Sequence, residues 1–188
     1  PVTYLRGKLR AGGGVEDVLE TVGQSYLLRR DAVWVDSDAF ASLVTAGLEF
    51  LADDNLGEAR ARFEEAESLY RGNYLEDEPY AEWCAEEREH LREVHLELLA
   101  GMAKTYAAEG LYMEASRVCR TALYHDPCRE SFLRALLENL VNFGRPDWAE
   151  AHYASWCRSL DDEYGLQPTD ETLRVYRDLV AGRSAAAS

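Results

Sequence analysis

The sequence contains none of the short motifs that usually mark an enzyme. It has no P-loop, no GxGxxG fingerprint, no HExxH pair and no GxSxG turn, which excludes the common nucleotide, zinc-protease and serine-hydrolase sites. The glycine run in 10–14 lacks the Lys-Ser/Thr pair of a phosphate cradle. The EEREH stretch at 86–90 would point its side chains in different directions on a helix. We therefore predict a protein that is not an enzyme and needs no cofactor.

Cysteine and histidine are scarce and poorly placed for holding a metal. The four cysteines form no CxxC pair, and none lies at metal-ligand spacing from the four histidines. The cysteines are Cys84, Cys119, Cys128 and Cys157. We expect them to be reduced residues that pack in a core, and we predict no metal site.

Long apolar runs are also missing. No stretch of about 18 apolar residues exists, and no charged-then-apolar leader is present, which predicts neither a membrane span nor a signal peptide. A cytoplasmic protein is the expectation. The net charge is −15, yet residues 1–30 carry +2 and the remainder −17. Because an acidic body repels phosphate, any contact with DNA is expected from the N-terminal piece.

The strongest positive signal is a repeat with a period of 34 residues that matches the tetratricopeptide pattern. The matching positions of one copy are Leu99, Met102, Ala103, Tyr106, Gly110, Tyr112, Ala115, Cys119, Ala122 and Pro127. Adding 34 gives Leu133, Leu136, Leu137, Leu140, Gly144, Ala149, Tyr153 and Trp156. An earlier copy begins near Val35 and has Leu43, Ala46, Gly47, Phe50, Ala59, Phe63 and Ala66. A 22-residue insert at 71–92 separates it from the next copy.

These copies predict an all-α, tetratricopeptide-like domain of about three helix pairs. Small residues let paired helices approach closely, and bulky ones fill the space between successive pairs. The insert is expected to begin as a loop at 71–79 and to become helical from Tyr80. A C-terminal helix after Pro168 is expected to cap the stack through Leu173, Tyr176, Leu179 and Val180. Residues 183–188 are expected to form a disordered tail.

Residues 15–30 fit two structures. Val15, Val18, Leu19, Val22 and Tyr26 recur at the spacing of an amphipathic helix. The same stretch also reads as two short strands around a small polar turn at 23–25, because β-branched and aromatic residues flank it. Periodicity alone leaves both open.

The stretch LYRGNYLEDEPYAEWCAEEREHL resembles a segment of the bacterial transcriptional activator domain found in regulators of the Streptomyces antibiotic regulatory protein type. The matching positions are Leu69, Tyr70, Arg71, Gly72, Trp83, Glu87, Arg88 and Leu91. DPCRE at 126–130 is similar to the Asp-Pro-x-x-Glu of that family, and EYGLQPTDET at 163–172 to its Glu-x-Gly-x-x-Pro-x-x-Glu-Thr ending. The resemblance covers about residues 33–180.

The resemblance implies a domain order. In that family the helical domain follows an OmpR-like winged helix whose last element is a β-hairpin. VLETVGQSYLL, followed by VWVDSDAF, is similar to that junction. It implies two strands turning at 23–25, with YLRGKLR at 4–10 as the end of a recognition helix. We therefore expect 1–32 to be the C-terminal remnant of a winged helix and 33–182 to be the activator domain. Arg6, Lys8 and Arg10 either approach DNA phosphate in a longer protein or form an ordinary basic helix end.

The function implied is regulation of transcription by contacts between helix surfaces and a protein, which is a partner protein, a second protomer or RNA polymerase. DNA would be bound through the upstream winged helix, and no membrane is involved. The alternative is a repeat adaptor, or the regulatory arm of a signalling ATPase, without DNA binding.

Tetratricopeptide geometry indicates which residues face the groove of the stack. They are Glu97, Ala100 and Lys104 in the second copy, Arg134, Glu138 and Asn142 in the third, and Ala41, Val44, Leu48 and Leu51 in the first. An exposed apolar stripe is costly, so we expect a cover over Val44, Leu48 and Leu51. The cover is either the protein itself, through the insert or the terminal helix, or a partner. Of these two we favour the protein itself.

We predict that this chain alone does not bind duplex DNA specifically at physiological salt. The reason is that a complete winged helix is expected to need scaffold helices that precede this sequence. An anisotropy titration with labelled promoter DNA measures the affinity of the chain for duplex DNA. Nanomolar binding would contradict the domain assignment.

Overall fold

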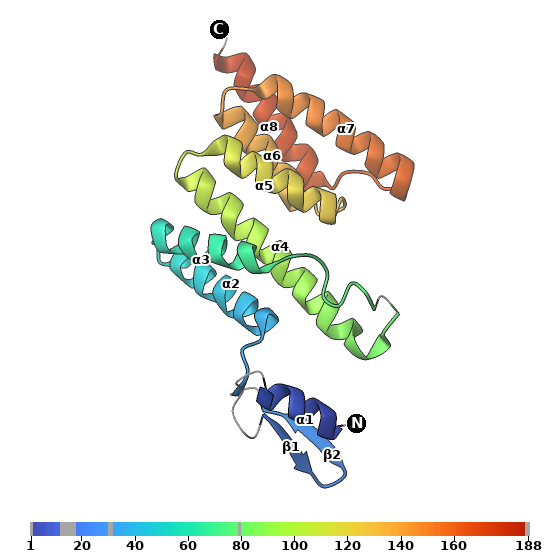
Figure 1. Cartoon of the computed structure of the whole chain (residues 1–188). Helices are drawn as coiled ribbons and strands as arrows, with labels where there is room; N and C mark the ends of the chain where they lie inside the picture. Colours follow the sequence, from blue (N-terminus) through green and yellow to red (C-terminus); the bar gives the residue numbers. More distant parts are fainter. Residues whose placement is uncertain (1, 12–17, 30–31, 79, 187–188) are drawn as a thin grey trace.

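Helices α2 to α7 form three antiparallel pairs that stack one after another (Figure 1). The computed structural model describes residues 2–11, 18–29, 32–78 and 80–186, with the side chains of 9–11 and 180–186 left out. The N-terminal elements are α1 (Val2–Ala11), β1 (Leu19–Val22) and β2 (Ser25–Leu28). The stack comprises α2 (Asp36–Ala52), α3 (Leu56–Leu69), the 3₁₀ turn η2 (Glu82–Cys84), α4 (Ala85–Ala108), α5 (Tyr112–His125), α6 (Glu130–Asn142), α7 (Pro146–Tyr164) and α8 (Asp170–Ala186). The predicted helix pairs and capping helix are confirmed.

The turns inside the three pairs repeat in backbone conformation. Asp54, Gly110 and Gly144 all have positive φ, at 58°, 76° and 84°. In each turn the next residue donates its N–H to a carbonyl five residues back, at 2.8–2.9 Å. This closure satisfies carbonyl groups that the end of a helix leaves open, and it favours a residue without a Cβ. The sequence repeat is therefore also a repeat of turn geometry.

The centre of the first two pairs is the ring of Phe63, which is fully buried. Gly47 of α2 and Gly101 of α4 both lie against the outer end of this ring. A Cβ added at Gly47 would stand 2.5 Å from Phe63 Cε1, and one added at Gly101 would stand 2.4 Å from Cζ. Such distances are far inside van der Waals contact, so both helices approach α3 as closely as they do only because these positions have no side chain.

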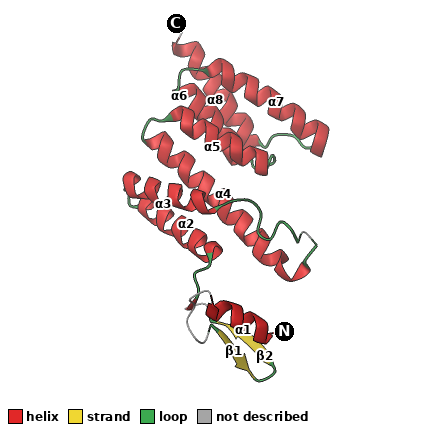
Figure 2. Cartoon of the chain, in the orientation of Figure 1, coloured by secondary structure: helices red, strands yellow, loops and turns green. Residues whose placement is uncertain are grey.

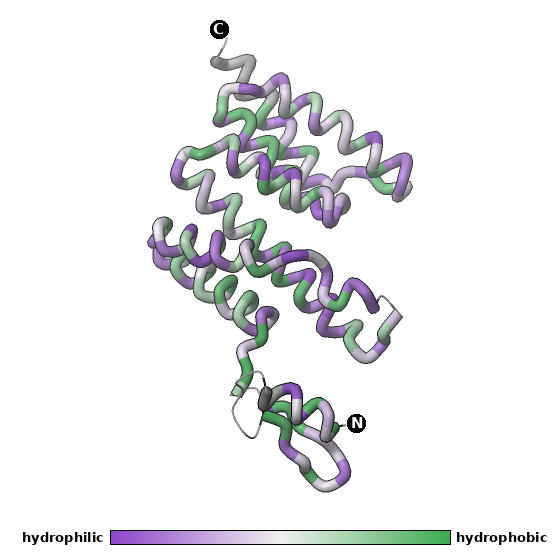
Figure 3. The backbone as a smooth tube through the Cα atoms, in the orientation of Figure 1, coloured by the Kyte–Doolittle hydropathy of each residue, from purple (hydrophilic) through white to green (hydrophobic). Residues whose placement is uncertain are grey.

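Apolar and polar residues alternate along the helices of the three pairs (Figures 2 and 3), and most of the buried residues are apolar. One continuous core joins the three pairs. Its largest fully buried members beyond Phe63 are Leu96, Leu98, Leu99, Met102, Leu133, Leu136 and Leu137. Since each pair can bury its apolar face only against a neighbouring pair, the stack is stabilised as a series of such contacts.

The insert differs from the prediction in where its helix begins. We expected helix from Tyr80, but α4 starts at Ala85, after η2. α4 then continues without a break into the first helix of the second pair, giving one helix of 24 residues. The insert thus consists of a loop and an N-terminal extension of α4. The predicted loop at 71–79 is confirmed for the residues that the structure describes.

The capping helix α8 is attached through residues of the two C-terminal motifs. Glu130 accepts hydrogen bonds from the Thr169 backbone N–H at 3.1 Å and from its hydroxyl at 2.6 Å. Arg134 donates to Thr172 Oγ1 at 2.9 Å and pairs with Glu171 at 3.3 Å. A carboxylate at the start of α8 is favourable because the helix N-terminus carries partial positive charge.

α8 extends to Ala186, so residues 183–186 are helical where a disordered tail was expected. Residues 187–188 lie outside the part of the chain that the structure describes.

The N-terminal segment is a helix and a β-hairpin, as the resemblance implied. β1 pairs antiparallel with β2, from Leu19 opposite Leu28 to Val22 opposite Ser25. The turn is therefore Gly23-Gln24, and Ser25 belongs to β2 and not to the turn. The glycine loop at 12–14 falls outside the described residues.

The close approach of two helices to Phe63 predicts that replacing glycine by alanine has opposite effects on stability at different positions. Gly47→Ala and Gly101→Ala should each lower the free energy of unfolding by about 1–3 kcal/mol, because the added Cβ overpacks a rigid ring. Gly57→Ala, also in a helix but with open space at its Cβ, should leave stability unchanged or raise it by up to about 1 kcal/mol. Urea unfolding followed by circular dichroism measures all three. Equal effects at the three positions would contradict this description of the core.

Candidate interaction surface

The loop of the insert is held in place by Arg88 in the first turn of α4. Its guanidinium donates to the carbonyl oxygens of Tyr74 and Glu78, each at 3.0 Å, and to Cys84 Sγ at 3.2 Å. The thiol of Cys84, which is buried, donates to the Ala81 carbonyl oxygen at 3.2 Å. A planar guanidinium has enough donors to hold several acceptors at once. One side chain of α4 therefore fixes the path of the loop.

Two large aromatic side chains project from the insert into solvent. Tyr80 is 94% exposed and Trp83 is 78% exposed; together they are called the insert tip below. The segment 76–90 around them contains seven acidic residues, six of them exposed. Exposed aromatic rings on a fixed support are typical anchors of protein interfaces. The acidic surroundings favour a partner surface that carries basic residues.

A groove of about 460 Å³ lies between α2 and α4. It is called the α2–α4 groove below, and its lining is Ala41, Ser42, Val44, Thr45, Ala46 and Glu49 from α2 with His90, Val94 and Glu97 from α4. Val44 and Val94 are buried, whereas Glu49, His90 and Glu97 are exposed. His90 and Glu97 are two turns apart on one face of α4. The groove thus has a narrow apolar floor and polar edges.

The residues predicted to face the groove differ in their exposure to solvent. Glu97, Lys104, Glu138 and Asn142 are exposed and accessible to a partner. Val44 is 1% exposed, and Leu48 and Leu51 are half-buried against the core. The protein itself therefore covers Val44, and it covers Leu48 and Leu51 only in part. Residues of α4 lie beside Val44, while α8 packs on α6.

Arg134 does not face an open groove. Its side chain is half-buried, and both its hydrogen bond to Thr172 and its ion pair with Glu171 attach α8 to α6. The repeat pattern placed this residue on the groove face because the pattern does not show where the capping helix lies. Its observed contacts are structural.

The basic residues of α1 are only partly available to a ligand. Arg6 donates to the Leu19 carbonyl oxygen at 3.0 Å and to Thr21 Oγ1 at 2.6 Å, so it joins α1 to the hairpin. Lys8 is exposed, and its Nζ lies 5.7 Å from the ring centre of Tyr4. The side chain of Arg10 lies outside the described part. A contact between this helix and DNA phosphate stays a prediction.

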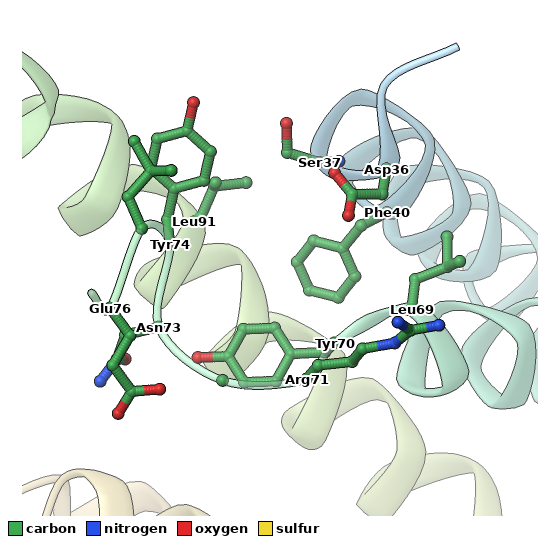
Figure 4. Close-up of a pocket in the computed structure, with 12 residues that line it drawn as sticks. Asp36, Ser37, Phe40, Leu69, Tyr70, Arg71, Asn73, Tyr74, Glu76 and Leu91 are labelled. Carbon is green, nitrogen blue, oxygen red and sulfur yellow. Dashed lines mark hydrogen bonds between the residues drawn. The ribbon is translucent and has the colours of Figure 1, made fainter. Parts of the chain in front are cut away.

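A pocket of about 290 Å³ lies between the first turn of α2 and the loop of the insert (Figure 4). The rings of Phe40, Tyr70 and Tyr74 and the side chain of Leu91 border it, and Asp36 and Ser37 lie on its α2 side. In this view the carboxylate of Glu76 points away from the rings. The pocket is called the Tyr70 pocket below.

The floor of the Tyr70 pocket is a stack of rings. Tyr70 lies parallel to His95 with ring centres 3.7 Å apart, and Phe40 meets Tyr70 at 5.5 Å. Burial lowers the pKa of His95 to about 4, and nearby His125 adds to that effect. His95 is therefore neutral at pH 7 and stacks as an uncharged ring. Burial also raises the pKa of Tyr70, which keeps its hydroxyl protonated.

No pattern in the sequence indicated the Tyr70 pocket. Its residues come from three segments, 36–40, 69–76 and 91, and no repeat or motif brings those segments together. The family-like motif did contain Tyr70, Arg71, Gly72 and Leu91, which all line it. That motif was a signal that this region has a specific structure, but not that it has a cavity.

The described residues contain neither a cluster of metal ligands nor a membrane-spanning helix. No group of three or more metal-ligating side chains occurs there. Within the same residues, no helix combines the length and apolar character that crossing a membrane requires. Cys84 and Cys119 are buried as expected, but Cys128 is exposed and Cys157 is half-buried, so only two of the four are core residues.

Comparison with known proteins identifies a family and two similar architectures. Residues 35–180 match the family model described as bacterial transcriptional activator domain. The chain is 29% identical over 172 residues to the transcriptional regulator RedD of Streptomyces coelicolor, covering 92% of this chain and 48% of RedD. The chain thus spans about half the length of this relative.

Two solved structures share the fold. Mycobacterium tuberculosis EmbR, solved in complex with a low-affinity phosphopeptide, superposes with a TM-score of 0.81 at 22% identity, over 96% of this chain and 48% of EmbR. The tetratricopeptide-containing C-terminal domain of a putative FK506-binding protein from Plasmodium falciparum gives a TM-score of 0.58 at 16% identity. It covers 82% of this chain and 96% of that domain.

The contacts of Arg88 predict a local effect when the guanidinium is removed. Arg88→Lys should speed amide hydrogen exchange in residues 73–84 by about tenfold or more, because an ammonium cannot hold the spread acceptors and a hydrogen bond to a charged group contributes about 1.5–3 kcal/mol. Arg92→Lys is the matched control, since Arg92 is exposed and its Nε lies 3.8 Å from Glu89. Equal rates of amide exchange in residues 73–84 of both variants would show that Arg88 does not hold the loop in place.

Proposed function

The chain belongs to the bacterial transcriptional activator domain family, and we propose that it is the part of its regulator that binds another protein. In this proposal a winged helix upstream binds promoter DNA in the cytoplasm, and the helical stack contacts the protein through its surface. The stack acts by binding and not by catalysis. The family match supports this reading over the adaptor alternative.

The observation that carries the proposal is the insert tip. Tyr80 and Trp83 are held outward by a loop that Arg88 fixes, so little ordering of the loop would be needed when a partner covers them. Such preorganised aromatic side chains contribute strongly to binding, often about 2 kcal/mol or more each. The α2–α4 groove, whose α4 side begins at His90, offers a second accessible surface.

Charge favours a partner other than a second copy of this chain. Residues 31–188 carry −17, and segment 76–90 is itself strongly acidic. Two copies of this chain would repel each other if the insert of one contacted the helical stack of the other. A surface of RNA polymerase with basic and apolar side chains fits better than a second protomer, and we propose it as the partner.

The proposal is tested with the full-length regulator and a promoter reporter. Tyr80→Ala with Trp83→Ala should lower activation at least about fivefold, because two exposed anchors of the interface are lost. Affinity for promoter DNA, measured separately by anisotropy, should stay unchanged. Tyr124→Ala is the control, since Tyr124 is 85% exposed on α5 and does not belong to the insert.

Two results would contradict the proposal. Full activation by the double variant would show that the insert tip is not the binding surface. A full-length protein without affinity for promoter DNA would instead favour the adaptor function.

A further inference from the structure

The Tyr70 pocket has the size and the preorganisation of a small-molecule site. Its volume of about 290 Å³ is near the lower end of ligand pockets in proteins. Phe40 is only 3% exposed, and Tyr70 is supported from behind by its stack on His95. The loop wall is held through the Tyr74 carbonyl by Arg88. A ligand would therefore enter a space whose aromatic sides are already in place.

The charge at the edge of this pocket favours a cation. Asp36 accepts a hydrogen bond from the Ser37 N–H at 2.9 Å, and no ion pair involves its carboxylate among the described residues. The full negative charge of Asp36, in the first turn of α2, outweighs the partial positive charge of the helix N-terminus. Aromatic faces also attract cations.

The basic residues near this pocket do not reverse that preference. Arg88 is bonded to carbonyl oxygens of the loop, and Arg92 lies 3.8 Å from Glu89. Arg71 is exposed, and in Figure 4 its guanidinium lies beside Leu69 and not among the three rings. The net charge of −15 adds a negative field over the whole chain. An anionic ligand would therefore meet the Asp36 carboxylate at the α2 side of the rings.

We propose that the Tyr70 pocket binds a small organic cation with a flat apolar body. The ammonium group lies at the Asp36 carboxylate, and the apolar body lies against Phe40, Tyr70, Tyr74 and Leu91. Because the pocket joins the start of α2 to the loop of the insert, the bound ligand ties these two segments together. The site is distinct from the insert tip and does not depend on the proposed protein partner.

Three ligands with the same indole ring test the proposal on the unmodified chain. They are tryptamine, which is a cation at pH 7, tryptophol, which is neutral, and indole-3-propionate, which is an anion. We expect tryptamine to bind at least about tenfold more tightly than indole-3-propionate, with tryptophol between them, since one charge contact near a protein surface contributes about 1–4 kcal/mol. Titrations followed by ¹H–¹⁵N NMR give the affinities and locate the shifts.

Two variants separate charge from shape. Asp36→Asn should bring the affinity for tryptamine down to that for tryptophol, whereas Asp53→Asn, at the other end of α2, should change neither. Ser37→Trp, which places an indole in the pocket, should abolish binding of all three ligands. The circular dichroism spectrum of each variant shows whether it is folded. If a variant does not fold, the comparison of the three ligands on the unmodified chain still tests the proposal.

The proposal is overturned by any of three results. One is equal affinity for tryptamine and tryptophol, or tighter binding of indole-3-propionate. Another is a set of shifted amides away from residues 36–40 and 69–76. The third is the absence of saturable binding by tryptamine at millimolar concentration.

Discussion

The contact of Phe63 with two glycines is the constraint on which the rest of the structure depends. Gly47 and Gly101 leave room for a ring that joins α2, α3 and α4 at one point. A side chain at either glycine would push one helix away, and the next pair would lose its register on the first. The position of α4 follows from this contact, and α4 carries both the insert and the start of the second pair. The tight packing of three helices at Phe63 therefore fixes where α4 and the insert lie.

The residues that identify the family have structural roles that explain their order along the chain. Tyr70, Arg88 and Leu91 build the region around the insert, through a ring stack, hydrogen bonds to the loop and the side of a pocket. Arg129 of the second motif donates to both oxygens of Glu93 on α4, at 2.8 and 2.9 Å. Glu130 and Thr169 join that motif to the last one. The motifs are far apart in sequence because each connects one layer of the stack to the next.

Much of the fold could be predicted from sequence, because a repeat is a local pattern that recurs. The spacing of Ala115 and Ala149, or of Gly110 and Gly144, records the same helix contact and the same turn twice. The hairpin needed the resemblance to a family, since helix and strand spacing coincide in 15–30. The start of α4 was misplaced, because η2 and the loop are shaped by Arg88 and not by local helix preference.

The candidate sites were less predictable, because they depend on which segments meet in space. Arg134 was placed on an open face, but α8 covers it. Arg6 was expected either near DNA phosphate or at an ordinary basic helix end, and the sequence did not indicate its hydrogen bonds to the hairpin. The Tyr70 pocket joins three separate segments that carry no shared pattern. The sequence also could not show that Tyr80 and Trp83 are exposed, because an aromatic residue is more often buried than exposed.

The central claim is that the insert tip contacts another protein when the regulator acts. Photocrosslinking tests it most directly, with a photoreactive phenylalanine analogue at position 80 of the full-length regulator, assembled with RNA polymerase on promoter DNA. The account predicts a crosslink from position 80 to a polymerase subunit and none from the exposed position 162 on α7. Crosslinks from position 162 alone, or the absence of any crosslink from position 80 in a complex that activates transcription, would contradict it.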